Sequence, residues 1–154
     1  MHAAQQQFRR GLATMEFALI LPLILAFALA VIEGGMMFYS WLTIQKAAQS
    51  GARFAATGQG EDDGTRFARI LGVTEDWMTH LDKGEKTIVI TSWPSSLPAG
   101  DGVEGNAGGP CQMVEVAVTY AYHPFTPVIG DALPDTIDLY GADRKLNEPW
   151  RPCD

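Results

Sequence analysis

Residues 12–57 read LATMEFALILPLILAFALAVIEGGMMFYSWLTIQKAAQSGARFAAT, and this stretch decides the fold of the chain. Residues 17–32 carry no charge, and apolar residues then recur at helical spacing through 36–44. An alanine-rich helical pattern comes next and stops at the glycines of the GQGEDDG segment, 58–64. We therefore predict one continuous helix over the whole stretch, about 69 Å long at 1.5 Å per residue.

The first half of this predicted helix is apolar enough for a membrane. Its uncharged run, 17–32, is shorter than the roughly twenty residues that cross a bilayer. With the apolar residues on both sides the run is long enough to cross a bilayer, provided that Glu16 and Glu33 at its two ends are tolerated. Arg9 and Arg10 precede it, and the first later cation is Lys46. This asymmetry predicts a cytoplasmic N-terminus, with the rest of the chain on the other side.

Composition narrows the class of protein further. The 154 residues suffice for one domain of ordinary size, and 47% hydrophobic with 19% charged residues is typical of a folded chain. The net charge is −7, and the first eleven residues hold two arginines and no acid, which leaves −9 on the remainder. A body this acidic is repelled by phosphate backbones and gains nothing from anionic lipids. No nucleic-acid partner is expected.

The N-terminal segment permits three kinds of processing. Small residues in AFALA, 26–30, fit a secretory signal cleaved before Val31. The arginine pair also fits a twin-arginine signal, although RRGLA lacks the apolar pair expected after the arginines. The third possibility is a prepilin leader, cut after Gly11 so that the apolar segment is retained. We favour the prepilin leader, because the helical pattern continues unbroken past residue 30, whereas a disposable signal bears no special relation to the mature segment after it.

These residues resemble a known family. Gly11, Glu16 and Phe17 fit the G-x-x-x-x-E-[FY] processing motif of small Tad (tight adherence) pilins and pseudopilins, and the run up to Ala55 resembles the N-terminal signature of TadE-like proteins. The slots of that signature are filled by Gly11, Met15, Glu16, Phe17, Ala18, Leu19, Ile20, Pro22, Glu33, Gln45, Ala47, Ala48, Gly51, Ala52, Arg53 and Ala55. The later stretch VEVAVTYAYHPFTP, 114–127, resembles the family more loosely.

The resemblance gives Glu16 a role. Cleavage after Gly11 makes Leu12 the new N-terminus, and in pilin-type assemblies the carboxylate neutralises the terminal amine of a neighbouring subunit. An unpaired charge in hydrocarbon costs roughly 2.5–3.5 kcal/mol, so pairing between subunits favours assembly. The alternative is that Glu16 only reaches the cytoplasmic headgroups. For Glu33, near the outer interface, we expect solvation, and Pro22 is expected to bend the helix.

The sequence after residue 57 predicts a small domain that contains both a helix and strands. Apolar residues recur at helical spacing over 65–81, and the segments 85–93, 113–123 and 136–140 alternate as strands. A loop rich in proline and glycine, 94–111, separates the first two strands. The expected fold class is α+β, a long N-terminal helix packed on a small antiparallel sheet in a pilin-like arrangement.

Cys111 and Cys153 are the only cysteines. Outside the cytoplasm they fit one disulfide, either within the chain or to another subunit. Two free buried thiols remain the alternative until the compartment is known.

No motif in the sequence predicts catalysis or a metal site, so no enzyme activity and no cofactor are expected. The glycines of GDGVEG, 100–105, spell G-x-G-x-x-G, but no strand leads in and no helix comes after them. The acidic segments 60–64 and 100–102 lack the ligand register of an EF-hand and are interpreted as solvated turns. His80 and His123 accompany no nucleophile pattern.

These observations predict a prepilin leader at 1–11, the long helix at 12–57 and an extracytoplasmic domain at 58–154. The resemblance implies a TadE-type minor pilin or pseudopilin in the bacterial inner membrane that assists assembly of an adhesive pilus. Expected partners are a TadF-like pseudopilin, the major Flp-like pilin, the prepilin peptidase, the assembly platform and membrane lipid. The alternative is a signal-anchored exported protein whose small domain binds a ligand or a protein.

Overall fold

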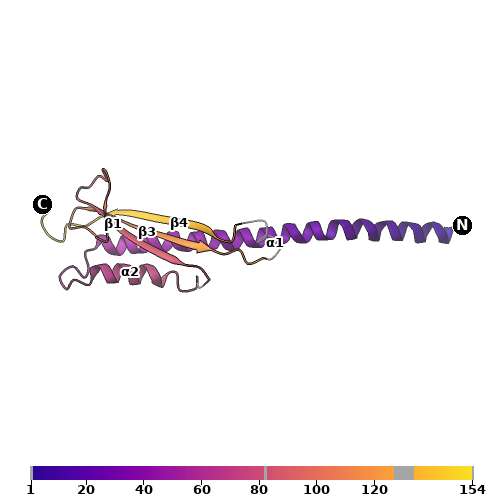
Figure 1. Ribbon diagram of the computed structural model, residues 1–154, viewed down its shortest axis with the longest axis horizontal. Coiled ribbons are helices and arrows are strands. Elements are labelled where there is room, and N and C mark those ends of the chain that lie inside the picture. Colours follow the sequence, from indigo (N-terminus) through magenta and orange to yellow (C-terminus); the bar gives the residue numbers. More distant parts are fainter. Residues whose placement is uncertain (1, 82, 127–133, 154) are drawn as a thin grey trace. The chain divides into compact units, whose positions relative to one another are not determined.

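The computed structural model of the chain describes residues 2–81, 83–126 and 134–153, with side chains from residue 14 onward. The described residues form the elements α1 (His2–Ala56), α2 (Arg66–Asp76), β1 (Lys86–Trp93), β2 (Val103–Glu104), β3 (Met113–Tyr122) and β4 (Ile137–Leu146). The chain divides into two compact units, Met1–Met36 with Pro124–Asp135 and Met37–His123 with Thr136–Asp154. A long apolar helix and a small antiparallel sheet confirm the predicted α+β class (Figure 1).

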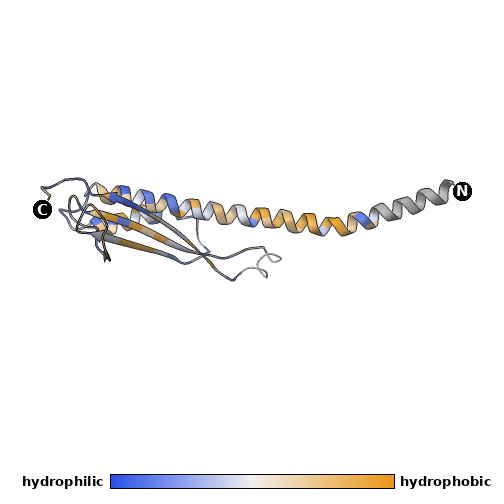
Figure 2. Cartoon of the chain, turned by 90° about the horizontal axis from the view of Figure 1, so that it is seen from above, coloured by the Kyte–Doolittle hydropathy of each residue, from blue (hydrophilic) through white to orange (hydrophobic). Residues whose placement is uncertain are grey.

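The predicted long helix is confirmed and extends further than expected. It begins at His2 rather than at residue 12, ends at Ala56, and continues through Pro22. Figure 2 shows a nearly continuous hydrophobic stretch in the part of α1 nearer the N-terminus whose side chains the structure describes. The large apolar side chains exposed on α1 in the first unit are Met15, Phe17, Leu19, Ile20, Leu21, Leu23, Ile24, Leu25, Phe27, Val31, Ile32 and Met36.

The sheet of the second unit has the order β2-β1-β3-β4, and all neighbouring strands are antiparallel. β3 is central and pairs along its whole length with β1 and β4. Burial alternates along β3 as the sequence predicted, because one face of the sheet is covered and the other is not. The buried β3 residues are Val114, Val116, Val118, Tyr120 and Tyr122.

The second half of α1 and the helix α2 cover this face of the sheet. Two clusters fill the space between them: Ile44 with alanines 47 and 48 of α1 belongs to one, and Ile70 of α2 packs with alanines 52 and 55 in the other. Small residues let the backbones approach closely. A Cβ atom at Gly51 would lie 2.2 Å from Thr74 Oγ1 on α2, and one at Gly141 of β4 would lie 3.1 Å from the Gln45 backbone nitrogen on α1.

Two predicted boundaries differ from the structure. The helix expected over 65–81 ends at Asp76, and turns come after it. Met78 and Leu81 are nevertheless buried in the core. The apolar pattern therefore continues past the end of the helix that it predicted. The strand expected at 136–140 runs on to Leu146, through a glycine and three charged residues that rarely favour strands.

Candidate functional site

Within the part of the chain that the structure describes, one helix is long and apolar enough to cross a membrane. It comprises residues Thr14–Ala56 of α1, and none of its most apolar window is buried inside the protein. Glu16 and Phe17 are both exposed at the start of this segment. Gly11 and Leu12 lie in α1, but their side chains lie outside the described residues. The predicted cleavage and charge pairing therefore stay predictions.

Glu33 is a buried carboxylate rather than a solvated one, which corrects the expectation from the sequence. Only 3% of the residue is exposed. One carboxylate oxygen accepts hydrogen bonds from the Thr126 hydroxyl at 2.8 Å and from the Thr126 backbone N–H at 3.1 Å. The Phe125 backbone N–H lies 3.3 Å from both oxygens. The sequence shows Glu33, but nothing in it identifies a partner 93 residues away.

These contacts explain how an acidic residue is tolerated so close to the apolar stretch. A buried charge is costly unless hydrogen-bond donors surround it, and backbone N–H groups in an apolar setting need acceptors. Glu33 and the segment 125–126 satisfy both needs at once. The carboxylate thus fixes this segment on α1, within the first unit.

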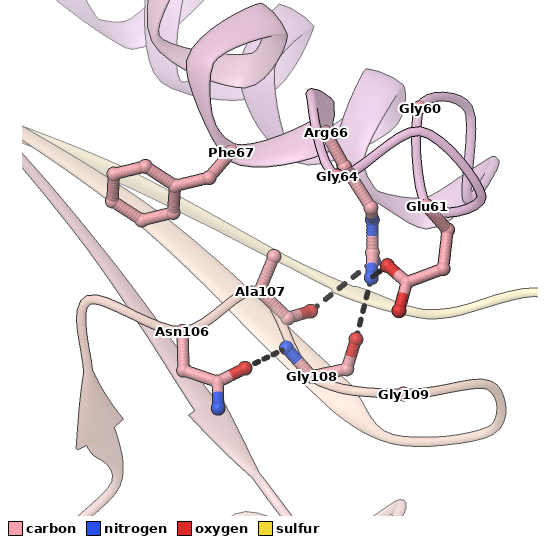
Figure 3. A pocket seen from close by; sticks show the side chains of 9 residues that line it. All are labelled: Gly60, Glu61, Gly64, Arg66, Phe67, Asn106, Ala107, Gly108 and Gly109. Carbon is pink, nitrogen blue, oxygen red and sulfur yellow. Dashed lines mark hydrogen bonds and ion pairs between the residues drawn. The ribbon is translucent and has the colours of Figure 1, made fainter.

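A second buried charge, Arg66 at the start of α2, ties together four parts of the second unit. Its guanidinium donates to the carbonyl oxygens of Ala55, Ala107 and Gly108, and pairs with Glu61 at 3.1 Å (Figure 3). The Trp150 ring lies against it, with Cζ 4.6 Å from the ring centroid. Burial lowers the pKa of the Arg66 guanidinium, and the hydrogen bond to Glu61 opposes that shift. Arginine stays charged at physiological pH even so.

Arg66 also forms one wall of a cavity of about 400 Å³ lined by glycine backbone and by Phe67 and Asn106. Because its guanidinium donates to loop carbonyls and pairs with Glu61, we interpret Arg66 as a structural tie. Sequence reasoning missed this residue. An arginine at a helix start usually lies on the surface, and only tertiary structure brings its acceptors together.

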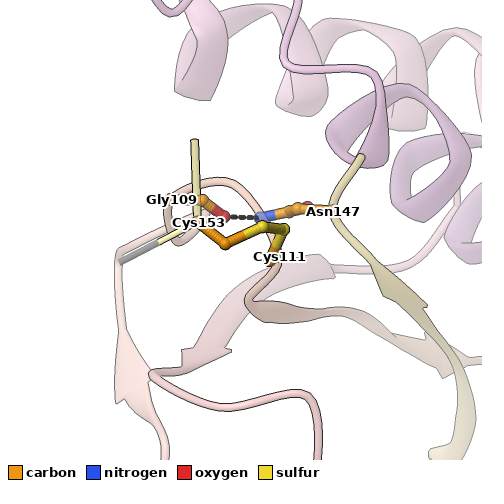
Figure 4. The surroundings of a disulfide bond; sticks show 4 residues. All are labelled: Gly109, Cys111, Asn147 and Cys153. Carbon is orange, nitrogen blue, oxygen red and sulfur yellow. Dashed lines mark hydrogen bonds between the residues drawn. A yellow bond between two sulfur atoms is a disulfide. The ribbon is translucent and has the colours of Figure 1, made fainter. Parts of the chain in front are cut away.

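The structure joins Cys111 and Cys153 in a disulfide within the chain, with 5.7 Å between their Cα atoms. Cys111 has a φ of 61°, and its backbone N–H donates to the Asn147 carbonyl. Asn147 is 1% exposed, and its side-chain amide donates to the carbonyls of Ala107 and Gly109 (Figure 4). The bridge and Asn147 therefore hold the C-terminal segment against the loop before β3.

The acidic turn at 60–64 forms ion pairs with arginines. Glu61 pairs with Arg66, Asp62 with Arg151 and Asp63 with Arg69. Among the described residues, no group of three or more histidine, cysteine, aspartate or glutamate side chains is arranged to hold a metal ion. His80 and His123 contact the Tyr39 hydroxyl and the Ala121 carbonyl respectively.

The geometry thus defines a class: a chain with one apolar helix long enough to span a membrane and a small α+β domain that continues from it. Comparison with protein families places a TadE-like protein match on residues 11–53. This confirms the resemblance seen in the sequence and relates the chain to Tad pilus proteins. No curated protein and no solved structure matches the chain significantly.

Proposed function

We propose that the protein is a TadE-type minor pilin or pseudopilin that is anchored by α1 and assists assembly of an adhesive Tad pilus. The observation that carries this proposal is that the family match and the exposed apolar surface fall on the same part of the chain. The family match covers 11–53, and the exposed apolar surface of α1 begins within this stretch. An exposed apolar surface of this size is stable only when lipid or other apolar helices cover it.

The N-terminal end of that surface is where processing and pairing take place in this proposal. A prepilin peptidase on the cytoplasmic side cuts after Gly11, and Leu12 becomes the N-terminus. Glu16 then neutralises the new amine of a neighbouring subunit. The neighbours are other pseudopilins or the major pilin, recruited at the inner-membrane assembly platform.

The domain after α1 serves as a structural module outside the cytoplasm. Its described interior is filled by alanines, β-branched residues and tyrosines, together with Met78, Leu81 and Trp93. The buried charge Arg66 bonds to backbone carbonyls of the same unit. This organisation supports a role in assembly by contact.

N-terminal sequencing of protein purified from its native membrane tests the proposal. We expect the mature chain to begin at Leu12, and Gly11→Val to leave full-length protein, since a side chain there crowds the scissile bond. A start near Val31 would contradict the proposal, because cleavage there removes most of the apolar stretch. A start at Met1 would favour the signal-anchored alternative.

A further inference from the structure

The exposed face of α1 stays apolar well past the uncharged run and then changes abruptly. Large side chains remain exposed through Leu42, which is 42% exposed. The next exposed residues of the helix are Lys46, Gln49 and Arg53. An amphipathic helix that emerges from lipid shows such a change where it meets water.

The domain is already packed on α1 before this change. Ser40, Thr43 and Ile44 are buried on the opposite side of the same helical turns. The exposed side of α1 is therefore still apolar at helical turns whose opposite side already packs within the second unit.

Aromatic residues dominate the exposed surface at this level. Phe38 and Trp41 pack with ring centroids 5.7 Å apart, and the Trp41 indole N–H donates to the Tyr140 carbonyl of β4 at 3.2 Å. On the adjoining side of the helix the Tyr39 hydroxyl lies 3.0 Å from His80 Nε2. Phe38, Tyr39 and Tyr140 are more than half exposed. Rings with an exposed apolar body and a satisfied polar end suit the boundary between hydrocarbon and water.

The length of α1 places these rings in the headgroup layer. Twenty helical residues, from Phe17 to Met36, cover about 30 Å, the thickness of the hydrocarbon core. Glu33 and the segment 125–126 that it binds then lie at the outer edge of this core, where the carboxylate satisfies the backbone N–H groups of Phe125 and Thr126. Residues 37–42 add about 9 Å, so Phe38, Tyr39 and Trp41 lie about 3–7.5 Å beyond the core, within a headgroup layer of about 5–7.5 Å. Lys46 then lies in water.

We propose that Phe38, Tyr39, Trp41, Leu42 and Tyr140, here called the aromatic collar, contact the phospholipid headgroup layer on the outer side of the membrane. This inference rests on the proposed anchoring by α1. The acidic body gives no attraction to anionic lipids, so the contact is made by aromatic rings and is insensitive to salt.

Fluorescence quenching tests this contact in the full-length chain, inserted into phosphatidylcholine vesicles with bromine on acyl carbons 6 and 7. We expect brominated lipid to quench part of the tryptophan emission. Trp41→Phe should lose most of the quenched part, whereas Trp150→Phe should keep it, because Trp150 packs against Arg66. The same result is expected at low and at high salt.

A matched pair on β4 reports on the domain itself. Tyr140 and Leu146 are 57% and 49% exposed and lie on the same strand, about 20 Å apart at 3.3 Å per residue. We expect Tyr140→Trp to add emission that brominated lipid quenches, and Leu146→Trp to add emission that it does not quench. Equal quenching of the two variants, or unchanged quenching in Trp41→Phe, would overturn the proposal.

Extraction at alkaline pH separates this inference from the proposed anchoring. Protein that stays with the vesicles while Trp41 is not quenched refutes the collar and leaves the anchor in place. Protein that is released from its native membrane refutes the anchor. Quenching of Trp41 that disappears when the chain assembles with other subunits supports the collar in the membrane-bound state.

Discussion

The backbone N–H of Glu148 donates to the carbonyl oxygen of Ala56 at 2.8 Å, so the C-terminal segment closes the last turn of α1. The last carbonyls of a helix have no partner within the helix. The neighbouring carbonyl, that of Ala55, accepts from Arg66 at 2.8 Å. The end of α1 therefore depends on Arg66 and on a tail that is held by the disulfide.

Arg66→Met should destabilise the second unit strongly. The substitution keeps an unbranched apolar stem but removes the donors to three loop and helix carbonyls. Each buried carbonyl left without its donor costs about 1–3 kcal/mol. Denaturant unfolding of the full chain in detergent, monitored by circular dichroism, measures the loss.

Arg69→Met is the matched control for this prediction. Arg69 belongs to the same helix, and its ion pair with Asp63 is about half exposed on both sides. An exposed pair contributes up to about 1 kcal/mol. Equal effects of the two substitutions would show that Arg66 is not a structural tie.

Cys153→Ser should lower the stability and release the tail. The bridge spans a sequence separation of 42 residues, and the chain-entropy relation gives roughly 4 kcal/mol for a loop of that size. Non-reducing electrophoresis of native protein should show a compact monomer. A reducible dimer would indicate pairing between subunits, and two freely alkylated thiols would also argue against an oxidising compartment.

The long helix and the central strands could be predicted because their signals are local. Apolar spacing runs unbroken to Ala56, and β3 alternates in sequence as it does in burial. The extension of β4 could not be predicted. A Cβ atom at Gly141 would lie 3.1 Å from the Gln45 backbone nitrogen of α1, so the close helix favours a glycine mid-strand, and this reason exists only once the helix is packed there.

The buried charges were missed for the same reason. Glu33 was expected to be solvated, and Arg66 has no distinguishing neighbours in sequence. Their partners lie 92 and 93 residues away for Glu33 and 41 and 42 away for the loop carbonyls at Arg66. A single buried polar residue leaves no periodic pattern in the sequence, so an analysis of periodicity does not reveal it.

Asp63→Asn should change the response of the domain to acid. The Thr65 hydroxyl and backbone N–H donate to Asp63, and these bonds, with Arg69, hold the pKa of that carboxyl below its ordinary 3.8. A lowered pKa stabilises the folded state above the unfolded value, and this contribution is lost as the pH falls through the folded value. Wild type should melt higher than the variant at neutral pH, and the difference should shrink below pH 3.8. A constant difference over the whole pH range would refute this account.

Glu33→Gln should free the segment that Glu33 holds. The amide keeps the size of the side chain, and its oxygen can still accept from Thr126, but the negative charge is lost and its NH₂ group lies beside the Phe125 N–H, from which it cannot accept. Hydrogen bonds to a charged acceptor contribute about 1.5–3 kcal/mol, so amide exchange at Phe125 and Thr126 should rise about tenfold or more. Thr126→Val removes one hydroxyl donor and should raise exchange much less. Similar exchange in both variants would mean that the carboxylate is not the anchor.

Glu16→Val separates membrane insertion from assembly. Removing a charge from the start of the apolar stretch should leave insertion at least as good as in wild type. Assembly should fail, because the new amine at Leu12 loses its partner in the neighbouring subunit and an uncompensated charge enters the helical bundle. Membrane fractionation gives the protein level, and electron microscopy of cells counts the pili. Glu16→Asp is the control: it keeps the charge on a shorter side chain and should retain part of the assembly. Normal pili at a normal protein level in Glu16→Val would show that this carboxylate only reaches the cytoplasmic headgroups, and that assembly draws on the apolar face of α1 alone.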